Sequence, residues 1–214
     1  FDMGGYDQDE TNINADFGKT LSSNVFLAFG AEWREETFTT VPGEQAAIDG
    51  NTSGMSSVKP ADAGEFSRDN MAFYVDMEHD ISDELMLQYA LRFEDFSDFG
   101  STVNGKVAGR YTLSDAVTLR SSVSTGFHAP TPGQANVSTT ITTFDGTTGL
   151  QVEEGLVRPT SAGALAVGGA PLKEEESVNM SLGFTADIAD NTTLTFDMYK
   201  VAVDDRIYRT GDIA

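Results

Sequence analysis

Apolar residues recur at every second position along many stretches of this chain, and this period of two constrains the fold more than any other feature. A period of two belongs to a β-strand whose two faces lie in different environments. No stretch shows the i, i+3, i+4 spacing of an amphipathic helix, so we predict an all-β fold. The apolar rows are Ile13, Ala15, Phe17; Val25, Leu27, Phe29, Ala31, Trp33; Met71, Phe73, Val75, Met77; Leu85, Leu87, Tyr89, Leu91, Phe93; Val103, Val107, Tyr111; Val117, Leu119, Val123; Val178, Met180, Leu182, Phe184, Ala186; and Leu194, Phe196, Met198.

Short polar turns separate pairs of these rows. An apolar residue followed by three small or polar residues and a strand start recurs at 21–25, 81–85, 113–117 and 188–192. Ser, Asp and Asn suit tight turns because their side chains bond nearby backbone groups. In the first three copies the flanking apolar residues fall on the same face of the hairpin. We predict eight antiparallel strands near residues 11–21, 25–39, 68–81, 85–97, 102–113, 117–128, 175–188 and 193–208.

The other connections differ in length from these turns. Residues 40–67 and 129–174 are long and rich in small and polar residues, whereas 98–101 is short. Short turns on one side and long loops on the other are typical of outer-membrane barrels. Several predicted strands also reach the roughly 9–11 residues that a tilted membrane-spanning strand needs. The pattern therefore predicts part of an antiparallel up-and-down transmembrane β-barrel.

The residues between the apolar rows are polar or small and mix acidic with basic side chains, which suits a water-filled or plug-filled interior. Aromatic residues near the predicted strand ends, such as Trp33, Phe93 and Tyr208, match the girdles of such barrels. Lys200 breaks the last apolar row, which predicts a β-bulge or an exit from the membrane there. A soluble β-sandwich also alternates, and eight strands can close as a small barrel, so both alternatives stay open.

Charge and composition exclude several classes of partner. Lys and Arg total 13 against 34 Asp and Glu, which gives a net charge of −21. Phosphate contacts need a basic face, so nucleic acid is not an expected partner. The chain has no cysteine, which excludes disulfides and thiolate metal sites.

Four segments resemble, in order and spacing, motifs of TonB-dependent receptor barrels. Residues 124–130 read Ser-Thr-Gly-Phe-His-Ala-Pro and are followed by Gln134, and 113–120 look like the turn and strand that lead into this motif. Residues 172–179 and the strand from 194 to Asp-Arg-Ile at 205–207 are similar to later family motifs. His128 stands where the family usually has Arg, and Glu174 where it usually has Pro.

The resemblance implies a bacterial outer-membrane receptor that takes up a scarce nutrient, namely an iron chelate, a vitamin or an oligosaccharide. Its implied partners are this small-molecule ligand, outer-membrane lipid and the TonB complex, which acts through a plug domain. The family barrel has about 22 strands, and we recognise no plug domain or terminal strand, so residues 1–214 are expected to form a partial barrel domain. The alternatives are a small passive or structural outer-membrane barrel and a soluble all-β carbohydrate-binding domain.

No nucleophile–base pair or metal-ligand cluster is recognisable, so we expect neither an enzyme nor a cofactor. His128, at the loop end of its strand, is the one candidate for ligand contact, and a structural strand-end role is the alternative. His79 is expected on the barrel surface near a turn. Residues 95–100 mix carboxylates and Gly but lack the spacing of a calcium loop. The loops 40–67 and 129–174 are together expected to form the ligand entrance.

Overall fold

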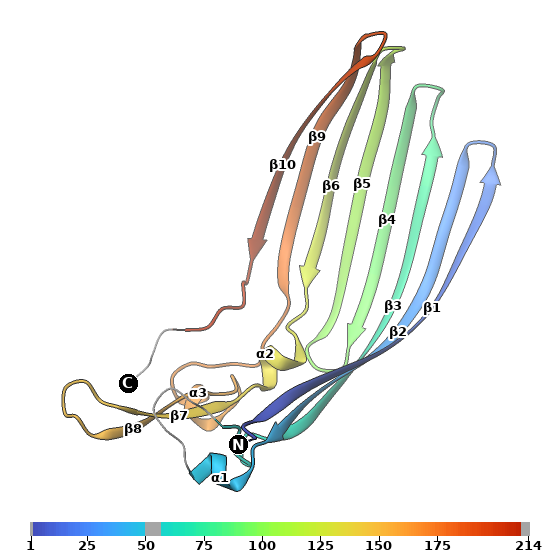
Figure 1. The fold of residues 1–214 in the computed structure, drawn as a ribbon. Coiled ribbons are helices and arrows are strands. Elements are labelled where there is room, and N and C mark those ends of the chain that lie inside the picture. The colour runs from blue at the N-terminus through green and yellow to red at the C-terminus, as the bar shows by residue number, and fades with distance from the viewer. Residues whose placement is uncertain (1, 50–56, 211–214) are drawn as a thin grey trace. The chain divides into compact units, whose positions relative to one another are not determined.

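Eight long strands form one antiparallel sheet in the computed structural model, which describes residues 2–49 and 57–210 (Figure 1). The strands lie in the order β1-β2-β3-β4-β5-β6-β9-β10, so their order in the sheet follows their order in the chain. The long connection from β6 to β9 carries the separate hairpin β7–β8. The eight strands are β1 (Gly4–Ser22), β2 (Val25–Pro42), β3 (Gly64–Asp80), β4 (Leu85–Phe96), β5 (Gly100–Ser114), β6 (Val117–His128), β9 (Glu175–Ala189) and β10 (Thr192–Asp204).

The predicted up-and-down topology is confirmed for all eight strands. Their ends differ from the prediction in several places. β1 begins at Gly4, and β10 ends at Asp204, so Tyr208 lies beyond the strand. β1 and β10 are the two edges of the sheet, which means that these eight strands do not close into a barrel of their own.

The chain divides into two compact units, which we describe separately. The wall unit consists of residues 12–33, 70–129 and 173 onward. The loop unit consists, as far as it is described, of residues 2–11, 34–69 without 50–56, and 130–172.

From β3 to β10 the strand pairing described in the wall unit is regular, with two exceptions. The register between β5 and β6 shifts between Thr112 and Ser114, which leaves Leu113 as an extra residue beside the turn. A second shift lies between Thr192 and Thr193 at the start of β10. From Thr193 to Asp204 the pairing with β9 is unbroken, so the bulge predicted at Lys200 is wrong. Val201 and Val203 simply point to the other side of the sheet, opposite Asn179 and Ser177.

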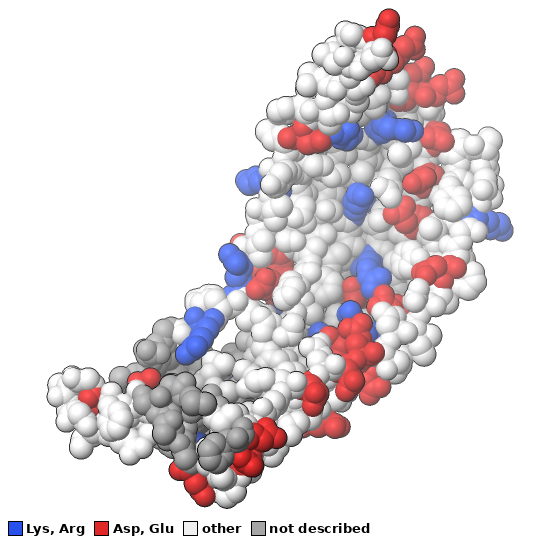
Figure 2. Space-filling view, in the orientation of Figure 1, with Lys and Arg blue, Asp and Glu red and all other residues white. Residues whose placement is uncertain are grey.

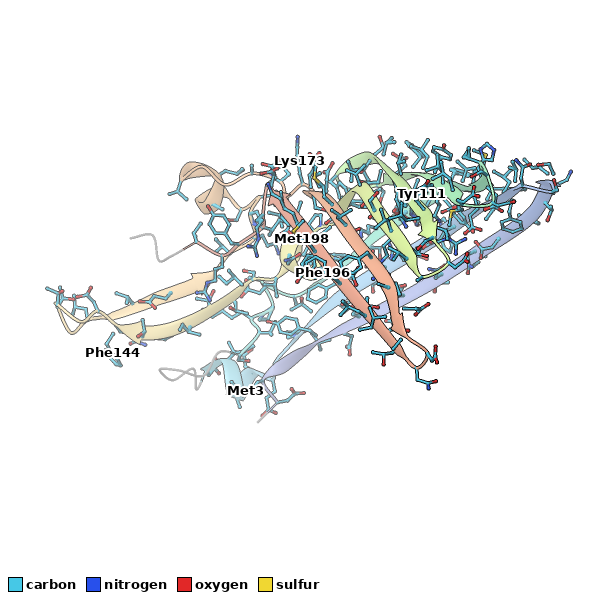
Figure 3. All side chains as sticks on the ribbon, turned by 90° about the horizontal axis from the view of Figure 1, so that it is seen from above. Met3, Tyr111, Phe144, Lys173, Phe196 and Met198 are labelled. Atoms are coloured by element: carbon cyan, nitrogen blue, oxygen red, sulfur yellow. The ribbon has the colours of Figure 1, made fainter. Side chains whose placement is uncertain are left out.

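In the wall unit the apolar side chains are exposed and several polar side chains are buried, which is the reverse of a soluble sandwich. The predicted apolar rows lie on one side of the sheet, the apolar face, and remain open: Phe73 is 51% exposed and Leu182 is 53% exposed. Phe196 and Met198 of one such row lie on β10 (Figure 3). Buried polar residues occur on the other side, the polar face, where Asn70 is 1% exposed and Glu94 is 6% exposed. An apolar face of this extent is stable only against an apolar partner, and lipid provides one.

The loop unit gives structure to both of the long connections. It contains the helices α1 (Gln45–Asp49), α2 (Pro132–Asn136) and α3 (Ala162–Ala166), and a hairpin of β7 (Thr139–Phe144) and β8 (Gln151–Leu156). Phe144 lies at the far end of this hairpin (Figure 3). Of the helices in the described residues, none has the length and apolar character to cross a membrane. The part of loop 40–67 at residues 50–56 lies outside the described residues.

α2 begins with a capping box that fixes the start of the second long connection. The Thr131 hydroxyl accepts a hydrogen bond from the Gln134 backbone N–H, and the Gln134 side chain accepts one from the Thr131 backbone N–H. Pro132 follows the cap, where its missing N–H leaves no helical hydrogen bond unmade. Such reciprocal capping stabilises even one helical turn, so the start of the second long connection has a defined local conformation.

Candidate functional site

The polar face of the wall unit carries a connected group of charged side chains across β1 to β4. The Arg92 guanidinium donates to Glu94 at 2.6 Å and to Glu32 at 3.0 Å. Asn12 donates to Glu32 at 3.0 Å, and Asn70 donates to Glu94 at 3.3 Å. These residues meet because alternate positions on neighbouring strands project to the same face of the sheet. A charged side chain that is partly buried on a sheet face needs hydrogen-bonding or oppositely charged partners, because it is shielded from water.

A second polar contact crosses from β1 to β3 on the same face. The Tyr74 hydroxyl donates to the Asp16 carboxylate at 2.6 Å, and Asn14 donates to the other carboxylate oxygen at 2.7 Å. Gly30 on β2 leaves the room for this contact. A Cβ added at Gly30 would lie 2.6 Å from the Tyr74 ring and 2.7 Å from the Asp16 carboxylate. The glycine is therefore required by the close approach of these side chains.

Arg120 and Asp197 form the third polar contact, between β6 and β10 across β9. The guanidinium donates to both carboxylate oxygens, at 2.6 and 2.7 Å, and to the Thr185 hydroxyl at 2.9 Å. The two side chains are 43% and 55% exposed, so solvent screens the pair and its contribution to stability is small. Its bidentate geometry nevertheless fixes the orientation of the guanidinium.

Apart from the ion pairs of Arg92 and Arg120, the two signs of charge are unevenly spread over the polar face. Acidic side chains such as Asp16, Glu32 and Asp76 come from β1 to β3, whereas Lys106, Arg110 and Arg120 come from β5 and β6. Figure 2 shows the basic groups near the middle of the sheet and many acidic groups on the side of β1 to β3. Arg110 lies directly opposite Arg120 in the strand register. The polar face is therefore a hydrated, charged surface, as expected for the interior side of a barrel wall.

Arg158 is the central cation of the loop unit. It donates to the backbone carbonyl of Asn136 at 2.8 Å and to that of Asp62 at 2.9 Å. Its guanidinium also lies 4.7 Å from the centre of the Phe66 ring. The Ser138 hydroxyl donates to the Asp62 carboxylate at 2.6 Å. Together the contacts of Arg158 and Ser138 tie the two long connections to each other.

Arg68 forms a buried ion pair in the same unit. It donates to Glu36 at 2.7 Å and to the backbone carbonyl of Pro130. The side chains of Arg68 and Glu36 are 5% and 9% exposed, so water screens this pair little. The start of the second long connection is thus fixed to β2 and β3. The sequence analysis did not single out Arg68 or Arg158, because neither stands in a motif or a recognisable spacing.

The two histidines lie apart, and neither belongs to the groups described above. His128 is the last residue of β6, is exposed and lies opposite Glu175. His79 is half-buried near the end of β3, opposite Leu87. The predicted strand-end position of His128 is confirmed, and its contact with a ligand stays a prediction. Among the residues that the structure describes, no three His, Cys, Asp or Glu side chains are grouped as metal ligands.

The turn at residues 95–100 is built around aromatic rings. The Phe96 and Phe99 rings stack with their centres 4.6 Å apart, and Phe127 contacts Phe96 edge-on at 5.8 Å. Gly100 has φ 111°, a conformation that other residues rarely adopt. Aromatic packing accounts for Phe96 and Phe99 in this turn, and the positive φ accounts for Gly100.

A twisted sheet with an exposed apolar face and a charged polar face defines the wall of an outer-membrane β-barrel. The family described as TonB-dependent receptor-like β-barrel matches the chain over residues 1–214. The ferric enterobactin receptor PirA of Pseudomonas aeruginosa is 28% identical over 162 residues, which are 73% of this chain and 20% of that protein.

Solved structures show the same fold. The siderophore receptor PirA of P. aeruginosa superposes with a TM-score of 0.67 at 20% identity, over 94% of this chain and 33% of that one. A mutant of the P. aeruginosa ferric enterobactin receptor PfeA in complex with enterobactin gives a TM-score of 0.68 at 16% identity, over 92% and 27%. The FrpB iron transporter of Neisseria meningitidis gives 0.57 at 15% identity, over 94% and 28%.

The chain belongs to the TonB-dependent receptor β-barrel family, whose members are bacterial outer-membrane proteins. It spans between a fifth and a third of the length of the relatives named above. The predicted family and location are thereby confirmed, and the soluble sandwich is excluded. The family is one of receptors and transporters.

Proposed function

We propose that this chain is part of the barrel of a receptor for the TonB-energised uptake of a scarce nutrient. The observation that carries the proposal is the pairing of an exposed apolar face with a charged polar face in a chain of this family. The apolar face meets lipid, and the polar face lines the route across the membrane. The receptor acts by binding and passage, without chemical conversion of its ligand.

Among the three nutrient classes, we propose an iron chelate. The support comes from the relatives, whose names describe a ferric enterobactin receptor, a siderophore receptor and an iron transporter. At identities of 15–28% these names suggest a class of ligand and no particular compound. The TonB complex, as the proposed partner, would act through a plug domain of the whole protein.

The loop unit is proposed as part of the ligand entrance, with His128 at the end of β6 as a candidate contact. Arg158 and Arg68 support this proposal because their hydrogen bonds help hold the long connections in a defined shape. A preformed loop surface binds a ligand with less loss of conformational entropy than a disordered one. His128→Ala in the whole receptor is expected to weaken ligand binding and leave the amount of folded barrel unchanged.

The test is uptake of radioactive iron chelates by cells that carry or lack the whole receptor. We expect receptor-dependent uptake that stops when TonB is deleted or the proton gradient is collapsed. Uptake that continues without TonB would indicate a passive barrel instead. TonB-dependent uptake of a vitamin or an oligosaccharide, without uptake of any iron chelate, would support the proposed receptor function and refute an iron chelate as its ligand.

A further inference from the structure

Arg158 joins the two ends of the hairpin segment in the second long connection. The connection leaves β6 through α2, runs out and back along β7 and β8, and reaches Arg158 shortly before α3 (Figure 1). The Nε–H group of Arg158 donates to the carbonyl of Asn136, the last residue of α2, at 2.8 Å. These two residues are 22 positions apart in the chain, so one hydrogen bond closes the base of the segment that carries β7 and β8.

The same guanidinium reaches the first long connection through a different nitrogen. Its Nη2 donates to the carbonyl of Asp62 at 2.9 Å, although Asp62 lies 96 residues earlier in the chain. The guanidinium also lies 4.7 Å from the centre of the Phe66 ring, which offers its attractive aromatic face. A Cβ added at Gly64 would lie 2.9 Å from this ring, so the glycine leaves the room that the ring occupies. Asp62 and Phe66 thus form a site for one guanidinium on the first connection.

The shape of the guanidinium gives Arg158 an effect that a simple cation lacks. Its N–H groups stand in a rigid planar fork, so two carbonyls bound by different nitrogens are held at a fixed distance from each other. The Ser138 hydroxyl adds one hydrogen bond between the connections, to the Asp62 carboxylate at 2.6 Å. Arg158 contributes two hydrogen bonds from a charged donor and the ring contact. Arg158 is therefore the larger of the two links.

Each connection also has local hydrogen bonds that report its opening separately. In the second connection the backbone N–H of Val137 donates to the carbonyl of Gly133 at 2.8 Å. In the first connection the backbone N–H of Asp62 donates to the carbonyl of Lys59 at 2.9 Å. Amide hydrogen exchange measures how often such a bond opens, so these two amides follow the two connections independently.

We propose that Arg158 couples the two long connections, so that they open and close together. Arg158 acts as a positioning residue, through the carbonyls that it binds on both connections. The functional meaning of this coupling rests on the proposed ligand entrance, because a ligand that orders one connection then orders the other as well. Two connections that are already ordered together lose less conformational entropy on binding than two that order separately.

The experiment measures hydrogen exchange in the whole receptor without any ligand. Thr131→Ala removes the cap of α2 and is expected to increase opening at the Val137 amide about fivefold. With Arg158 present, the same substitution is expected to increase opening at the Asp62 amide about twofold or more, although Asp62 lies on the other connection. In Arg158→Gln the effect on Asp62 is expected to disappear, whereas the effect on Val137 remains. This cycle of single and double variants isolates the coupling from the local effect of each substitution.

Arg158→Lys separates the shape of the guanidinium from its charge. Lysine keeps the positive charge but lacks the planar fork, so Thr131→Ala is expected to leave Asp62 unaffected in this variant too. Arg120→Gln in the wall unit is the control, because Arg120 also binds through several N–H groups but contacts neither connection. In that variant the effect on Asp62 is expected to persist. Heat-modifiable mobility on SDS gels confirms that each variant is folded.

Three results would overturn the proposal. Thr131→Ala could leave the Asp62 amide unchanged in the otherwise unaltered receptor, or its effect on Asp62 could persist in Arg158→Gln. Full retention of the effect in Arg158→Lys would show that a positive charge suffices and that the fork has no positioning role. The exchange measurement uses no nutrient and uptake is measured separately, so failure of this proposal is distinguishable from failure of the proposed function.

Discussion

The wall unit and the loop unit of this chain are stabilised in different ways. In the wall unit, long strands pair in regular register and leave their apolar side chains exposed on one face. In the loop unit, short elements are connected by Arg68 and Arg158, each of which bonds to backbone carbonyls distant in sequence. The wall depends on a repeated pattern and the loop unit on a few particular side chains.

This difference implies different sensitivities to substitution. A strand that shares its hydrogen bonds with two neighbours loses little when one exposed polar side chain is changed. An arginine that bonds to groups far apart in sequence, as Arg68 and Arg158 do, has no substitute, and its removal leaves unsatisfied groups behind. The following predictions test this contrast between the units.

The largest effect is expected for Arg68→Ala in the loop unit. The substitution leaves the buried Glu36 carboxylate with only the longer 4.0 Å contact to Arg34 and leaves the Pro130 carbonyl without this donor, at a cost of about 3–5 kcal/mol. Denaturant unfolding of the whole receptor, together with limited proteolysis within residues 130–172, measures it. Arg120→Ala in the wall unit removes an exposed pair and is expected to cost about 1 kcal/mol or less. Equal effects of the two changes would refute the contrast.

A charged side chain placed on the apolar face in the middle of a strand is expected to destabilise the folded wall unit in a bilayer. Leu182 lies near the centre of β9 and is 53% exposed, so Leu182→Lys is expected to cost about 2–4 kcal/mol in a bilayer. Reversible folding into lipid vesicles measures this free energy. The neighbouring Ser181→Lys, on the polar face, loses a hydroxyl hydrogen bond to Ser122 and is expected to cost about 1 kcal/mol. If Ser181→Lys were the more harmful, the assignment of the two faces would be reversed.

The wall could be predicted from sequence because its chemistry repeats every second residue. Rows such as Met71 to Met77 identify both the strands and the face that meets lipid. The first part of β1 was missed because Asp7 and Asp9 stand where the row would be apolar, although the backbone still pairs. The register shift at Leu113 was missed for a related reason, since a bulge changes the pairing without changing the composition.

The loop unit could not be predicted in the same way. β7 reads Thr-Thr-Ile-Thr-Thr-Phe, which has no apolar period, so the sequence predicts a long loop there and no hairpin. Arg158 meets the carbonyl of Asp62, which lies 96 residues earlier in the chain, and no local spacing indicates such a contact. The position of His128 at the end of β6 could be predicted because the apolar alternation stops there. Its contact with a ligand could not be derived in this way, because the alternation carries no information about the ligand.

A smaller effect is expected at Gly30, where side chains of neighbouring strands of the wall unit approach closely. A Cβ at Gly30 would overlap the Tyr74 ring and the Asp16 carboxylate, so Gly30→Ala is expected to cost about 1–3 kcal/mol. Denaturant unfolding measures it, with Gly105→Ala as the control, because the nearest atom there is 3.6 Å away. Tyr74→Phe combined with Gly30→Ala does not relieve the overlap with the ring, whereas Tyr74→Ala does. The added Cβ would also lie 2.8 Å from the backbone carbonyl oxygen of Ala15, so Tyr74→Ala is expected to recover only part of the lost stability, and full recovery would show that the ring alone causes the strain.

The smallest effect is expected at the tip of the β7–β8 hairpin and depends on pH. Hydrogen bonds from the Thr148 side chain and from the backbone N–H groups of Thr148 and Thr147 lower the pKa of Asp145 below its usual value. A lowered pKa means that the ionised carboxylate stabilises the folded turn above the unfolded pKa of about 3.9 and that this stabilisation is lost as pH falls through the folded pKa. Hydrogen exchange at the Thr147 and Thr148 amides is therefore expected to show more opening at acidic pH, once the intrinsic pH dependence of exchange is removed. Asp145→Asn should abolish this pH dependence, and amides of the wall unit between β4 and β5 should not show it. A turn whose opening is the same in Asp145→Asn at every pH would mean that the hairpin is held by its backbone pairing alone.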